Sequence, residues 1–146
     1  MKQIILSLAL LFGMNSYALD ANKLFNDYLD IKDALVKSDN HATKAAIDVY
    51  LKGIKSESEF TEKKALLKSV EKLSKAPDIE AKRTAFKEVS ITMWRLVKRL
   101  DQIKGPVYYQ YCPMKKAYWI SKEKAIRNPY YGSSMLTCGN ISETKI

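Results

Sequence analysis

The hydrophobic positions in the first two thirds of the chain recur at helical spacing. In residues 20–38, the apolar side chains Leu24, Tyr28, Ile31 and Leu35 follow one another at steps of four, three and four. This spacing places them along one face of an amphipathic helix. We therefore expect this helix to bury one side against the rest of the protein.

Three further segments repeat the helical pattern. They cover residues 41–54, a third helix that we expect to begin in the sequence SESEF, and residues 79–103. Pro77 separates the third helix from the fourth because proline disfavours helical geometry before it, and Asp78 is a suitable N-cap. Four helices with short connections favour an up-down bundle.

The pattern changes after Gly105 and Pro106. Residues 107–112 read VYYQYC, and the alternation of their side chains favours a short strand or extended segment. We expect a mainly α protein: residues 19–103 form the helical bundle, and residues 104–146 form a short extended or irregular segment rich in Cys, Met and Tyr. The side chains expected to pack it on the bundle are Tyr109, Tyr111, Trp119 and Tyr130.

The N-terminus has the features of a secretory signal peptide. Lys2 precedes an apolar run over residues 4–12, and the small residues Ser16 and Ala18 suit cleavage after Ala18. The apolar run is too short to span a membrane. We expect residues 1–18 to be removed and residues 19–146 to form a single exported, periplasmic domain without a membrane span.

Charge narrows the choice of partners. The formal net charge is +9, and the excess is concentrated after residue 103. A basic, aromatic-rich segment can bind nucleic acid. An exported protein rarely meets nucleic acid, however, and this segment has no arginine-rich run. We expect instead an electropositive surface that attracts an acidic partner from the cell envelope or an anionic surface.

The sequence gives little basis for catalysis. His41 is the only histidine, and it lies beside a predicted helix start, which is typical of a surface residue. The helical segment contains no Gly-rich phosphate loop and no Ser/His/Asp arrangement. We therefore expect a protein that is not an enzyme.

Each of the two cysteines has a methionine nearby. Cys112 and Met114 are two residues apart, so in an extended chain they project to the same side. Met135 and Cys138 are three apart, so in a helical turn they share a face. The turn sequence NPYYG, residues 128–132, lies between the two pairs and can bring them together.

Two interpretations of this sulfur cluster remain open from the residues alone. Thiolates and thioethers are soft ligands that select Cu(I) or Ag(I), with Trp119 and Tyr111 as neighbours of the site. Alternatively, a Cys112–Cys138 disulfide staples an exported domain and adds about 3.5 kcal/mol by chain entropy. In that case the methionines only pack against tyrosines.

Residues 107–139, which read VYYQYCPM…AYWISKEKAIRNPYYGSSMLTCG, closely resemble a bacterial domain-of-unknown-function family. This family occurs as exported proteins and at the C-terminus of periplasmic adaptor subunits of copper/silver efflux systems. The stretches YLDIKDALVKSD and DIEAKRTAFKEVS resemble its helical half. The resemblance implies a helical domain associated with heavy-metal handling. It favours a protein that hands Cu(I) or Ag(I) to an efflux system, or senses it there, over a disulfide-stapled interaction module.

Overall fold

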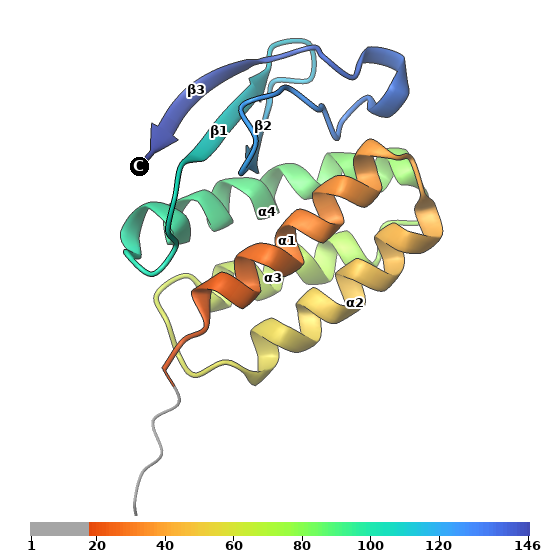
Figure 1. Ribbon diagram of the computed structural model, residues 1–146. Helices are drawn as coiled ribbons and strands as arrows, with labels where there is room; N and C mark the ends of the chain where they lie inside the picture. The colour runs from red at the N-terminus through yellow and green to blue at the C-terminus, as the bar shows by residue number, and fades with distance from the viewer. Residues whose placement is uncertain (1–17) are drawn as a thin grey trace, which may run out of the picture.

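Four helices and a three-stranded antiparallel sheet make up residues 18–146, the part of the chain that the computed structural model describes (Figure 1). This confirms the expected fold class, and it shows that part of the extended C-terminal segment forms a small three-stranded sheet. Residues 1–17 of the predicted signal peptide lie outside the described residues. The elements are α1 (Ala21–Val36), α2 (Asn40–Ser56), α3 (Lys63–Ser74), α4 (Ile79–Arg99), β1 (Val107–Cys112), β2 (Ala117–Ser121), the short 3-10 helix η1 (Gly132–Met135) and β3 (Asn140–Lys145).

The helices run up and down and pack in chain order. Helix α1 lies on α2, α2 on α3 and α3 on α4, and α1 also contacts α4 (Figure 1). The side chains of Asp20, Asp39 and Asp78 each accept a backbone N–H in the first turn of α1, α2 and α4. Such caps satisfy donors that have no partner inside the helix, so these three helices begin where the aspartates stand.

The expected start of the third helix was wrong. Helix α3 begins at Lys63 and not within residues 56–60. The cause is a contact between distant parts of the chain. Glu62, the residue at the N-cap of α3, accepts two hydrogen bonds on its carboxylate from the guanidinium of Arg99 in α4, at 2.9 and 2.6 Å. This paired contact fixes the chain before α3 in a turn, and local capping signals do not reveal it.

The sheet has the strand order β2-β1-β3. Strand β1 pairs with β2 through a tight turn, with Gln110 opposite Trp119 and Cys112 opposite Ala117. Strand β3 returns from the end of the chain to the other side of β1, where Tyr111 lies opposite Asn140. The register of this second pairing shifts after Tyr109. The central strand is therefore fixed on both edges.

Aromatic side chains join the sheet to the bundle. Tyr109 stacks on Trp94 of α4, with ring centroids 4.7 Å apart, and Tyr130 contacts Phe86 of α4 at 6.2 Å. These two expected contacts are confirmed. Of the other two expected rings, Tyr111 packs at a tilt against Tyr118, and Trp119 meets Tyr130 edge-on, both within the C-terminal segment.

A buried hydroxyl adds a polar link between the two layers. The Tyr28 hydroxyl of α1 is hydrogen-bonded to Ser90 Oγ of α4 at 2.8 Å and accepts the backbone N–H of Ile120 in β2 at 3.0 Å. Burial raises the pKa of this phenol well above its usual range. The hydroxyl therefore stays neutral and can donate one bond while accepting the other.

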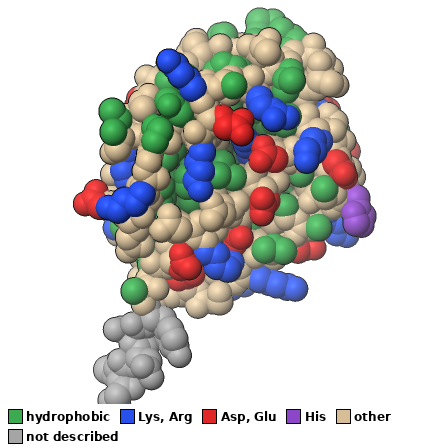
Figure 2. Space-filling view, viewed as in Figure 1, with side chains coloured by type: hydrophobic (Ala, Val, Ile, Leu, Met, Phe, Trp, Pro, Cys, Tyr) green, Lys and Arg blue, Asp and Glu red, His purple; other side chains and the backbone are tan. Residues whose placement is uncertain are grey.

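The surface of the helical layer mixes both signs of charge. Lysine and arginine side chains alternate with acidic ones over the face seen in Figure 2. Among residues 18–146, every helix is too short or too polar to cross a membrane.

Removing the Tyr28 hydroxyl should weaken the contact between bundle and sheet. Tyr28→Phe leaves the buried Ile120 N–H without an acceptor, so we expect the free energy of unfolding to fall by about 1–3 kcal/mol. Tyr50→Phe is the matched control: Tyr50 is equally buried, but its hydroxyl bonds only to the weak acceptor Met93 Sδ at 3.3 Å. The control should lose less than about 1 kcal/mol. Urea unfolding measures both, and equal losses would contradict the assigned role of Tyr28.

Candidate functional site

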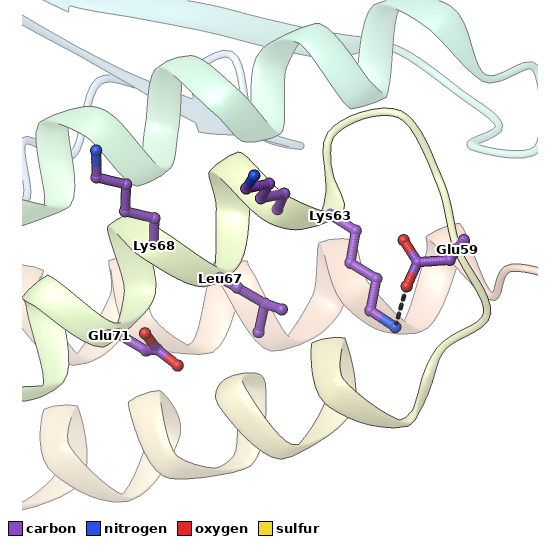
Figure 3. A pocket seen from close by; sticks show the side chains of 6 residues that line it. Glu59, Lys63, Leu67, Lys68 and Glu71 are labelled. Carbon is purple, nitrogen blue, oxygen red and sulfur yellow. Dashed lines mark ion pairs between the residues drawn. The ribbon is translucent and has the colours of Figure 1, made fainter.

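A hollow of about 470 Å³ runs along α3, on the side of the molecule that carries no cysteine (Figure 3). Its lining includes Lys63, Leu67, Lys68 and the acidic residues Glu59 and Glu71. The two signs partly neutralise each other, because the Lys63 ammonium lies 3.4 Å from the Glu59 carboxylate. The hollow is open and mixed in charge, so the candidate site is sought in the C-terminal segment instead.

Cys112 ends strand β1 with its side chain fully buried. Its sulfur accepts the backbone N–H of Lys115 at 3.4 Å, from the turn that joins β1 to β2. Pro113 opens this turn, and the carbonyl of Pro113 accepts the N–H of Lys116 at 3.3 Å. The turn therefore folds back over the thiol and holds it near the end of the sheet.

Cys138 lies between η1 and β3 and is half-buried. Its N–H donates to the Met135 carbonyl at 3.1 Å, which closes one turn of chain. Its own carbonyl accepts the Asn128 side-chain amide at 2.7 Å. These bonds place the second cysteine at the start of the strand that pairs with β1.

A close backbone approach brings the two cysteines together. Gly139 has a φ of +149°, and a Cβ added there would lie 2.8 Å from Trp119 Cη2 and 2.8 Å from the Tyr111 carbonyl oxygen. Only glycine fits this position without a shift of its neighbours. Since Tyr111 precedes Cys112 and Gly139 follows Cys138, this contact sets the two thiols beside each other.

The neighbouring thiol affects the acidity of Cys138. Partial burial raises the pKa of Cys138, and the hydrogen bond and charge of Cys112 raise it further. Both cysteines are free thiols in the structure. The predicted proximity of Cys112 and Cys138 is thus present, and the raised pKa favours the protonated form of Cys138 at neutral pH.

The two methionines of the candidate site face solvent. Met114 lies in the turn after β1 and is 65% exposed, and Met135 at the end of η1 is 39% exposed. Neither side chain is packed into the core, in contrast to Met93 of α4, which is fully buried. Each thioether therefore lies at the surface within three residues of a cysteine.

The aromatic neighbours differ in position. Trp119 is fully buried, and its ring tip meets Gly139, so it forms part of the floor beneath Cys138. Tyr111 is half-exposed, and its ring is tilted against that of Tyr118 with centroids 4.5 Å apart. The Trp119 ring therefore approaches the residue after the second cysteine, whereas Tyr111 approaches it through its backbone carbonyl.

The basic side chains of this segment fall into two groups. Lys115 lies over the Tyr131 ring at 4.7 Å and near Glu80, and Lys122 lies over Phe25 at 5.3 Å. Side chains at three further positions are exposed: Lys116, Lys124 and Arg127. Part of the basic charge thus stabilises the fold, and part remains at the surface.

Within residues 18–146, no three or more His, Cys, Asp and Glu side chains come together as ligands for a metal ion. Two thiols with two methionine thioethers form a donor set that differs from such a cluster of His, Cys, Asp and Glu. The residues that could hold a soft metal are the ones expected from the sequence: Cys112, Cys138, Met114 and Met135.

Asn128 was missed in the sequence analysis. The motif NPYYG predicts a turn, but its first residue also reaches Cys138 across the loop. An asparagine at the head of a turn is the only sequence signal for this role, because its side chain often bonds to nearby backbone.

Comparison with known families identifies the helical half of the chain. The model of a family described as "Protein of unknown function (DUF3347)" matches residues 24–105. The protein belongs to this family. The DUF3347 match begins within the first turn of α1, covers α2, α3 and α4 and ends before β1, so the cysteines lie outside it. No curated protein and no solved structure matches the chain.

The raised pKa of Cys138 predicts slow alkylation at neutral pH. The thiolate is the reactive form, so the rate should rise with pH through a midpoint above the ordinary value of about 8.5. Cys112→Ala removes two of the three causes, the hydrogen bond and the charge of Cys112, and should lower this midpoint, while burial of Cys138 remains. Iodoacetamide labelling of the reduced, metal-free protein, followed by mass spectrometry, measures the rate. A midpoint no higher than that of the denatured protein would contradict the assigned environment.

Proposed function

We propose that this protein binds a soft monovalent metal ion, Cu(I) or Ag(I), through Cys112 and Cys138, with Met114 and Met135 as thioether ligands. The observation that carries this proposal is the side-by-side placement of two free thiols at an edge of the fold with an exposed methionine close to each in the chain. Soft sulfur donors favour Cu(I) and Ag(I) over hard cations, which prefer oxygen.

The donor set fits such an ion. Two thiolates supply the strong, negatively charged ligands, and two thioethers add neutral soft ligands. The raised pKa of Cys138 favours its protonated form at neutral pH, so a bound ion must displace the proton of this thiol. Affinity for the ion should therefore increase with pH. Trp119 and Tyr111 complete the surroundings of the site.

Exposure of the methionines supports this function over a purely structural one. In a disulfide-stapled module, Met114 and Met135 are expected to pack against tyrosines. Both are instead among the exposed large hydrophobic side chains. Moving a thioether from solvent to a metal ion at the surface costs no core packing. The disulfide remains the alternative, since adjacent thiols are also the precursor of a Cys112–Cys138 bond.

The proposed setting is the periplasm, where the protein hands the ion to an efflux system or senses it there. Three features support this setting: the signal-peptide pattern predicted for residues 1–18, the resemblance of residues 107–139 to C-terminal segments of copper/silver efflux adaptors, and exposed basic side chains in the same segment as the cysteines. The basic groups, including Lys116, Lys124 and Arg127, suit an acidic partner in the envelope.

Single substitutions separate the metal function from the disulfide. Met114→Leu and Met135→Leu should each weaken Cu(I) binding at least tenfold, because they delete a thioether and keep the volume. The free energy of unfolding should change by less than about 1.5 kcal/mol. Cys112→Ser and Cys138→Ser should abolish tight binding. Competition with a Cu(I) chelator and thermal melts of the reduced proteins measure both effects.

Met93→Leu is the matched control. Met93 is buried in α4, so its substitution should alter stability and leave Cu(I) affinity unchanged. The disulfide module predicts the reverse for the four site variants. Either serine variant would melt several degrees below the oxidised protein, and both surface leucine variants would bind Cu(I) like the wild type. A reduced wild type that cannot compete with the chelator would exclude the proposed function.

A further inference from the structure

The loop that carries Cys138 is closed by one buried asparagine. Asn128 is fully buried, and each of its polar groups has a partner within the same loop. Its backbone N–H donates to the Leu136 carbonyl at 2.7 Å, and its carbonyl accepts the Gly132 N–H at 3.0 Å. Its side-chain oxygen accepts the Tyr130 N–H at 2.8 Å, and its side-chain nitrogen donates to the Cys138 carbonyl at 2.7 Å.

The far side of the loop is tied to the rest of the protein. Arg83 Nε donates to the carbonyl of Pro129 at 2.9 Å, directly beside Asn128. The Tyr130 hydroxyl donates to the carbonyl of Tyr118 in β2. Asn128 therefore lies between Pro129, which Arg83 holds in place, and Cys138. The hydrogen bond from its side chain fixes the backbone of Cys138 relative to Pro129.

We infer that Asn128 is the positioning residue of the cysteine pair, which holds Cys138 against Cys112 before any metal ion arrives. A pair fixed in this way loses little conformational entropy when it binds an ion or forms a disulfide. The part of this inference that concerns copper rests on the proposed function. The placement of the two thiols side by side does not depend on the proposed function, and it can be measured without metal.

The metal-free test is the equilibrium with glutathione. Oxidised glutathione takes two electrons from the dithiol and yields two reduced glutathione molecules, while the two protein sulfurs join in a disulfide. The equilibrium constant reports the effective concentration of one thiol at the other. Asn128→Asp keeps the acceptor for Tyr130 but turns an oxygen towards the Cys138 carbonyl in place of the donor. We expect the effective concentration to fall at least tenfold.

Two controls separate positioning from a general loss of stability. Asn22→Asp changes the same kind of bond, from a side-chain amide to the Gln102 carbonyl at 3.2 Å, at an exposed site. Tyr28→Phe destabilises the fold without touching the loop. Both should leave the glutathione equilibrium within twofold of the wild type. An equal fall in Tyr28→Phe and Asn128→Asp would overturn the inference, as would a wild type that does not oxidise at all.

Hydrogen exchange in the wild type tests the inference even if Asn128→Asp fails to fold. The Asn128 side-chain amide should exchange far more slowly than that of Asn22 in the metal-free, reduced protein, as NMR can measure. Equal exchange rates would overturn the inference.

Competition with a Cu(I) chelator distinguishes failure of the metal function from failure of the positioning role. A wild type that binds no Cu(I), with the glutathione effect intact, removes the metal function alone. Unchanged glutathione and Cu(I) equilibria in Asn128→Asp remove the positioning role alone.

Discussion

A buried guanidinium connects the helical bundle to the loop that carries Cys138. Arg83 of α4 donates to the Leu35 carbonyl at 3.0 Å and to Ser38 Oγ at 2.8 Å, where α1 ends, and to the Pro129 carbonyl at 2.9 Å. Its remaining nitrogen pairs with Glu80. Burial of a cation is costly unless its donors are all used, so this geometry is strongly constrained. The position of the loop therefore depends on where α1 ends and where α4 begins.

This connection gives the helices a role in the site although they contribute no ligand. The family match covers residues 24–105, which include Arg83, whereas the loop that Arg83 holds lies beyond it. The loop also approaches the bundle very closely, because a Cβ added at Gly132 would lie 2.5 Å from Ser38 Oγ. The bundle thus supports the loop, and under the proposed function the ligands lie in the segment that rests on the bundle.

The sequence predicted the helices well because their signals are local. Apolar spacing, Pro77 and the aspartate caps act within a few residues. The same reasoning found strand β1 but not its place at the centre of a sheet. Its two faces are both covered, by the bundle through Tyr109 and by residues 123–125 through Gln110, so its burial does not alternate. The pairing of Tyr111 with Asn140, which sets Cys138 beside Cys112, joins distant parts of the chain and leaves no local pattern.

Two adjacent thiols can either bind a metal ion or form a disulfide. The protonation of Cys138 affects these two reactions differently. A raised pKa at Cys138 lowers the fraction of thiolate at neutral pH, which slows attack on a disulfide partner. A soft metal ion, in contrast, binds the thiolate strongly enough to displace the proton. Under the proposed function, the environment that slows oxidation of the empty pair therefore leaves it able to bind Cu(I). In this arrangement Asn128 holds Cys138 close enough to Cys112 for the pKa of Cys138 to be raised.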